Sequence, residues 1–88
     1  MVFIISYDLC LPGQRYDDLI ELIKKEGNWA RLGGSAYLLE SNKTAVEIRD
    51  LLKGALDCND KLYVGKVTAP AAWSGMSEKV SEWIKNKL

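Results

Sequence analysis

Val2-Phe3-Ile4-Ile5-Ser6-Tyr7-Asp8 is the stretch that decides the fold. It opens with four apolar residues, three of which are β-branched. A continuous apolar run of this kind, without polar alternation, indicates a strand that is central in its sheet or covered on both faces. The Pro12-Gly13 pair that follows is typical of a loop, so we expect the strand to end at Asp8.

The period becomes helical after this loop. Apolar side chains recur three or four positions apart, at Tyr16, Leu19, Ile20 and Ile23. Charged residues fill the other side, with acids early and lysines late, which predicts an amphipathic helix from about Gln14 to Glu26. Gly27 is placed to end it.

A hairpin is predicted next. Trp29–Leu32 and Ser35–Glu40 are strand-like, and Gly33-Gly34 between them suits a two-residue turn. The pattern then returns to a helix, since Thr44 and Glu47 form a capping-box pair ahead of an apolar stripe.

The last third contains a turn, a strand and a helix. Asp57–Asp60 is turn-like, and Leu62–Val67 predicts a fourth strand. Ser77 can cap a final helix whose apolar stripe must cover either the same sheet or a second subunit.

These elements predict one α+β domain over residues 1–88. Residues 1–67 form a ferredoxin-like β-α-β-β-α-β sandwich, and residues 68–88 add a loop and a C-terminal helix.

Charge and composition exclude several functions. The 88 residues carry 12 Lys and Arg, 12 Asp and Glu, and no His. The absence of His excludes catalytic groups that need His and also His-ligated metal sites. The balanced charge excludes a strongly basic nucleic-acid clamp. The short apolar start does not resemble a signal peptide, and no apolar run is long enough for a membrane span. We expect a cytoplasmic protein with no membrane contact, in which Cys10 and Cys58 are reduced.

Asp8 is the main chemical candidate, because strand ends beside loops often carry sites. The competing interpretation is an Asx-turn with loop amides. One carboxylate makes a poor Mg²⁺ site, but a two-fold dimer could bring a second Asp8 beside the first. Only that arrangement would support metal-assisted phosphodiester hydrolysis.

Four further residues are candidates for the same site. Ser35 and Tyr37 alternate on one strand, so their hydroxyls could hold a phosphate or a metal-bound water; the alternative is a turn serine and a half-buried aromatic. Arg15 and Arg31 could flank Asp8 and bind substrate, or belong to a solvated mixed-charge surface. Three tryptophans could stack on bases, but core or interface roles suit a neutral chain better.

Ile4-Ile5-Ser6-Tyr7-Asp8-Leu9 resembles the opening strand of the CRISPR-associated Cas-two family and of its relative, virulence-associated protein D. A set of small "SinR family" proteins is also similar, in the Tyr-Asp-Leu segment, the Pro-Gly loop, Asn59-Asp60-Lys61-Leu62 and Ala72-Trp73. The resemblance implies a ferredoxin-like homodimer in which paired Asp8 residues bind a divalent metal. Some Cas-two proteins cut RNA or DNA, and others are a non-catalytic platform for DNA.

The chain departs from that family in two places. The arginine-rich stretch that often follows the Asp is replaced by a segment with one Arg and two acids, which weakens nucleic-acid affinity. A final helix stands where a closing strand usually crosses to the partner.

Two hypotheses follow, and whether the chain is an enzyme stays open between them. The first is a Cas-two-like, Mg²⁺-dependent nuclease acting on RNA or DNA, or a degenerate relative of one. The second is a non-catalytic homodimeric module that binds a protein partner, as in toxin–antitoxin or phage-defence systems.

Overall fold

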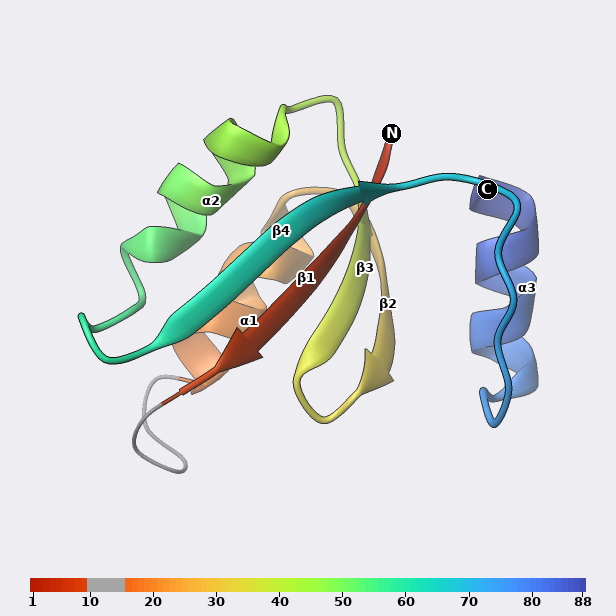
Figure 1. Ribbon diagram of the computed structural model, residues 1–88, viewed down its shortest axis with the longest axis horizontal. Helices are drawn as coiled ribbons and strands as arrows, with labels where there is room; N and C mark the ends of the chain where they lie inside the picture. Colours follow the sequence, from red (N-terminus) through yellow and green to blue (C-terminus); the bar gives the residue numbers. More distant parts are fainter. Residues whose placement is uncertain (10–15) are drawn as a thin grey trace.

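The computed structural model describes residues 1–9 and 16–88 (Figure 1). The predicted loop at Pro12-Gly13 lies outside the described residues, as do Cys10 and Arg15. The elements in chain order are β1 (Val2–Asp8), α1 (Tyr16–Lys25), β2 (Asn28–Gly33), β3 (Ala36–Glu40), α2 (Ala45–Lys53), β4 (Lys61–Val67) and α3 (Glu78–Lys87).

The strands form one four-stranded sheet in the order β2-β3-β1-β4. Each neighbouring pair is antiparallel. The α+β class and the interior position of the first strand are both confirmed, since β1 pairs with β3 on one side and β4 on the other. Helices α1 and α2 cover one face of the sheet, and α3 lies on the opposite side (Figure 1).

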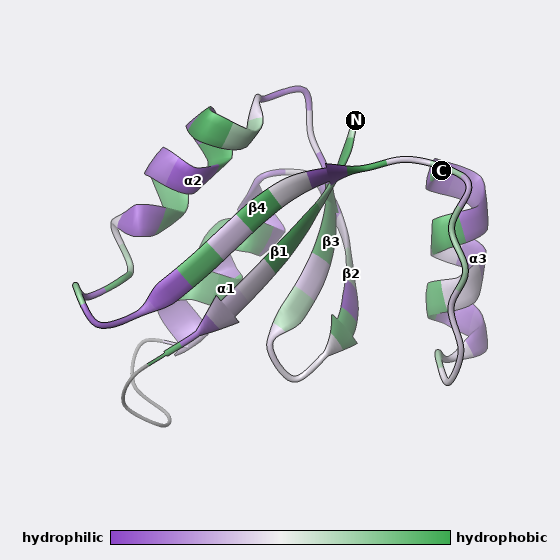
Figure 2. Ribbon diagram, in the orientation of Figure 1, coloured by the Kyte–Doolittle hydropathy of each residue, from purple (hydrophilic) through white to green (hydrophobic). Residues whose placement is uncertain are grey.

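Alternation along β1 explains why its apolar run is continuous. Phe3, Ile5 and Tyr7 face α1 and α2, where they join the main core. Val2 and Ile4 point the other way, into a second cluster with Ile84 of α3. Figure 2 shows how hydropathy changes along β1. The strand is apolar through its first half and more polar near its carboxyl end.

The capping box that begins α2 is present as predicted. The Thr44 hydroxyl accepts a hydrogen bond from the Glu47 amide at 3.1 Å, and the Glu47 carboxylate accepts one from the Thr44 amide at 2.9 Å. This reciprocal pair satisfies two amides that the first turn of a helix leaves without partners.

The position of the hairpin turn was predicted wrongly by one residue. The turn residues are Gly34 and Ser35, and β3 begins at Ala36. The register shifts between Arg31, which lies opposite Tyr37, and Gly33, which lies opposite Ala36. Leu32 is therefore an extra residue in β2, a β-bulge that lengthens the strand to Gly33.

Gly27 follows α1 for a steric reason. A Cβ at this position would collide with the backbone carbonyl oxygen of Glu40 on β3. The absence of a side chain therefore allows the start of β2 to approach β3 closely.

Helix α3 packs on the sheet of its own chain. Ser77 caps it by accepting a hydrogen bond from the Val80 amide at 3.2 Å. Ile84 is buried, and Lys87 forms an ion pair with Glu40 of β3 at 3.2 Å. None of the helices in residues 1–9 and 16–88 has the length and apolar character that crossing a membrane requires.

Candidate functional site

Helix α3 covers only part of its face of the sheet. Val2, Ile4 and Val67 lie in the cluster that α3 completes. Toward the carboxyl end of β1 the same face is exposed, and it presents Ser6, Asp8, Lys61 and Tyr63. We call these four residues the open face.

The register of β1 and β4 sets the geometry of the open face. Asp8 lies directly opposite Lys61, and Ser6 lies opposite Tyr63. Directly opposed residues of an antiparallel pair have Cβ atoms about 5 Å apart. A shallow hollow of about 270 Å³ is bordered by these four residues together with Tyr7 and Leu62. A carboxylate, an ammonium, a hydroxyl and an aromatic ring thus share one exposed patch.

Tyr63 is the most exposed large apolar side chain of this patch, at 65%. Its ring lies close to Gly65, two residues along β4, because a Cβ built at Gly65 would come within 2.7 Å of ring atoms. The glycine therefore leaves room for the ring to lie along the strand. The tyrosine is held against the sheet and still faces outward.

The other predicted site residues do not join Asp8. Tyr37 is 4% exposed and lies opposite Ile5, so it points into the main core on the far side of the sheet. Arg31 lies opposite Tyr37 on β2 and shares that side. Ser35 is an exposed turn residue, whose carbonyl oxygen accepts a hydrogen bond from the Tyr7 amide at 3.0 Å. The sheet thus separates Asp8 from Tyr37 and Arg31, and Arg15 lies outside the described residues.

Tyr37 belongs to a group of tyrosines at one end of the main core. The rings of Tyr7 and Tyr16 lie 5.7 Å apart, and the Tyr7 hydroxyl is 3.4 Å from the Gly34 carbonyl oxygen. Burial of Tyr7 raises the pKa of its hydroxyl, and the neighbouring Tyr37 adds to this shift. The Tyr7 hydroxyl therefore stays protonated near neutral pH, so it suits packing better than proton transfer.

A single chain offers a poor ligand set for Mg²⁺. Residues 1–9 and 16–88 contain no group of three or more Cys, Asp or Glu side chains that could hold a metal ion. Mg²⁺ takes octahedral oxygen ligands, and the cross-strand neighbour of Asp8 is a cation, Lys61, which would repel it. The donor set on the open face therefore does not fit this metal without a second chain.

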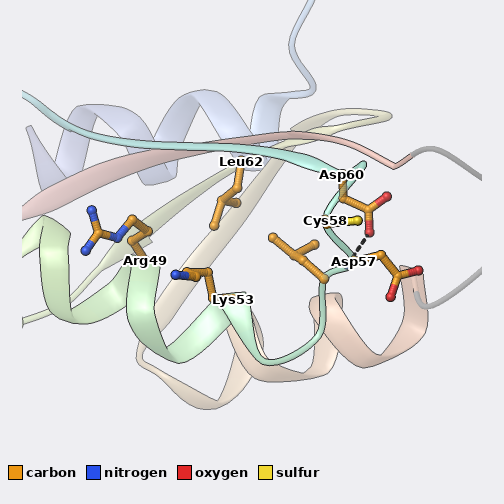
Figure 3. Close-up of a pocket in the computed structure, with 7 residues that line it drawn as sticks. Arg49, Lys53, Asp57, Cys58, Asp60 and Leu62 are labelled. Carbon is orange, nitrogen blue, oxygen red and sulfur yellow. Dashed lines mark hydrogen bonds between the residues drawn. The ribbon is translucent and has the colours of Figure 1, made fainter.

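A larger hollow, of about 370 Å³, lies between α2 and the start of β4 (Figure 3). Arg49 and Lys53 of α2 lie on one side, and the turn that carries Asp57, Cys58 and Asp60 lies on the other (Figure 3). The Asp60 carboxylate accepts a hydrogen bond from the Asp57 amide at 2.8 Å, which closes the turn as predicted. Both signs of charge line this hollow, so it favours no ligand charge.

Sequence reasoning overlooked Lys61 and Tyr63. Lys61 and Tyr63 lie two positions apart on β4, so their side chains point to the same face of the sheet. The pairing of β1 with β4 was needed to show that this face is also the one that carries Asp8.

Neither a protein-family model nor a curated protein sequence matches this chain. The open face is therefore interpreted from its own residues.

Proposed function

We propose that this chain is a ferredoxin-like domain that acts as a homodimeric protein-interaction module, with the open face as the contact between the two copies. The order β2-β3-β1-β4, with antiparallel neighbours throughout, supports the ferredoxin-like assignment. The exposed thiol of Cys58 suits a reducing, cytoplasmic location, which is part of the same proposal.

The observation that carries the dimer is the charge pattern of the open face. Asp8 and Lys61 are adjacent, exposed and opposite in charge. In a two-fold contact, residue i of one copy meets residue j of the other, and the reverse holds as well. Asp8 of each copy can then lie against Lys61 of the other, so the surface is complementary to itself. Tyr63 adds an exposed aromatic ring, a residue type enriched at interfaces.

Charge reversal tests this arrangement. Asp8→Lys and Lys61→Asp each place like charges opposite one another, so each should weaken dimerisation by at least about tenfold. The double variant restores opposite charges and should recover the dimer. Sedimentation equilibrium over a range of protein concentrations measures all four proteins.

Glu21→Lys on the exposed surface of α1 is the matched control, because it changes the charge equally on the helix that covers the opposite side of the sheet. It should dimerise like the parent. A parent protein that stays monomeric at high concentration would overturn the proposal, and so would single variants that dimerise as tightly as the parent.

A metal-dependent nuclease is the second candidate, and the exposure of Asp8 at the end of β1 favours it. A dimer through the open face could bring two Asp8 carboxylates together, and Mg²⁺ commonly uses one or two carboxylates with water and phosphate oxygens. Ser6 and Tyr63 would then supply the hydroxyls on the same face, in place of Ser35 and Tyr37. The zero net charge predicts weak affinity for nucleic acid.

Cleavage of labelled RNA and DNA in Mg²⁺ or Mn²⁺ distinguishes the two candidates. A nuclease should lose its activity in Asp8→Ala and keep it in Glu21→Lys. Equal cleavage by the parent and Asp8→Ala would identify a contaminant and remove this candidate. A nuclease dimer should also tighten when Mg²⁺ is added, whereas the interaction module should dimerise equally well in a chelator.

A further inference from the structure

A groove runs between the edge strand β2 and helix α3. One part, of about 240 Å³, is lined by Trp29, Ala30, Arg31, Lys79, Val80 and Trp83. It continues past the hairpin turn into a second hollow of about 310 Å³, which shares Arg31 and Val80 and reaches Ser77 at the start of α3. The groove thus follows the length of β2, on a different part of the molecule from the open face.

Two tryptophans, Trp29 and Trp83, line the first hollow. Trp29 is 39% exposed, although two neighbours hold its ring in place. The Tyr37 ring lies 6.0 Å from it, and the Lys24 ammonium lies 4.6 Å from its centroid, within the range of a cation–π contact. A ring that is already fixed loses little conformational entropy when a partner binds, and Trp is among the residues that dominate binding energy at interfaces.

The groove carries charge of one sign only. Within the described part of the chain, its charged lining residues are Arg31 and Lys79, and no Asp or Glu lines either hollow. This contrasts with the zero net charge of the whole chain. The Arg31 Nε donates a hydrogen bond to the Gly33 carbonyl oxygen at 3.1 Å, which orients the guanidinium. Among the described residues this is its one hydrogen-bond partner, so its remaining N–H donors can serve a ligand. Carboxylates are the complementary groups for such a lining.

The backbone of β2 offers a third contact. Among the strands of the described residues, β2 pairs only with β3, so its other edge has no strand beside it. Extended peptides bind such edges by adding a strand, with alternate side chains entering pockets beside the sheet.

We infer that this groove binds an extended acidic segment of a partner protein, which adds to β2 as a strand. Its carboxylates pair with Arg31 and Lys79, and an apolar side chain enters the hollow between Trp29 and Trp83. This inference rests on the binding function proposed above, because it names the class of partner. It does not depend on the dimer, since the two surfaces share no residue.

The probe is a fluorescein-labelled, end-capped heptapeptide of alternating Glu and Val with Phe at its centre. Fluorescence anisotropy measures its binding to the full chain, and tryptophan emission reports contact with the groove. Arg31→Glu and Trp29→Ala should each weaken binding by at least about tenfold. Lys53→Glu, an equal charge change on α2, should leave binding unchanged, and circular dichroism confirms that each variant is folded.

Two further probes decide what the groove recognises. The same peptide with Lys in place of Glu should not bind, and neither should the Glu peptide with Pro at alternate positions, because Pro removes the amide donors that strand pairing needs. Failure of the Glu peptide to bind, binding that Arg31→Glu leaves intact, or tighter binding of an oligothymidine of similar length would each overturn the inference. Peptide binding by Asp8→Lys, the variant expected to weaken the dimer, is measured alongside and separates failure of this inference from failure of the dimer.

Discussion

The two faces of the sheet differ although they alternate along the same strands. On the side of α1 and α2, Phe3, Ile5 and Tyr7 are buried to the end of β1. On the other side, Val2 is buried under α3, but Ser6 and Asp8 are exposed. One face is filled by two helices, whereas the other has one helix over part of its area. Stability is therefore concentrated on the first face, and the surfaces free to bind lie on the second face and along its edge.

The largest expected effect comes from the two-helix face. Ile5 has no exposed surface, and Ile5→Ala removes most of its side chain from the core cluster that it shares with residues of both helices. We expect a loss of about 4 kcal/mol in the free energy of unfolding, measured by urea denaturation. Ile5→Val, which removes one methylene, should cost only about 1 kcal/mol. Similar losses for the two variants would mean that this face is not closely packed.

A smaller effect is expected under α3. Ile84 is 4% exposed, but its cluster contains only two other buried residues, Val2 and Leu38, among those described. Ile84→Ala should therefore cost about 2 kcal/mol, near the low end for such changes. Tryptophan emission should shift to longer wavelength, because Trp73 and Trp83 pack against the same cluster.

Combining Ile5→Ala with Ile84→Ala tests whether the faces are independent. Their losses should add to within about 0.5 kcal/mol if the sheet transmits little strain between them. A clear departure from additivity would show that the two faces form one coupled core.

The smallest effect concerns the pH dependence of α3 docking. Hydrogen bonds from Asn28 and Lys87, together with the charge of Lys87, hold the pKa of the Glu40 carboxyl below its usual value. A lowered pKa stabilises the folded state at pH values above the ordinary carboxyl pKa of about 4.3, and this contribution is lost as the pH falls through the folded value. Acid titration followed by tryptophan emission should show α3 loosening below about pH 4.

Glu40→Gln keeps an acceptor for Asn28 but removes the charge. Its contribution to the acid transition should disappear, leaving a flatter curve than that of the parent. Identical curves would show that Glu40 does not hold α3 in place.

Most of the elements could be predicted because their signals are local. The apolar run at Val2, the capping pair of Thr44 and Glu47, and the Ser77 cap all depend on residues a few positions apart. The hairpin turn was misplaced because the bulge at Leu32 depends on how β2 pairs with β3, which two adjacent glycines do not reveal. Tyr37 and Arg31 were grouped with Asp8, but the pairing of Tyr37 with Ile5 and with Arg31 places both residues across the sheet from Asp8.

The sequence by itself determined the order of strands and helices, the interior position of β1 and the exclusion of His-dependent chemistry. These properties follow from local periodicity and composition. Only the tertiary structure decided that Asp8 lies beside Lys61, that α3 covers one end of its face, and that Trp29 and Arg31 share a groove with α3. Each of these arrangements brings together residues that are distant in the chain. It therefore depends on strand register and helix packing, which leave no local pattern in the sequence.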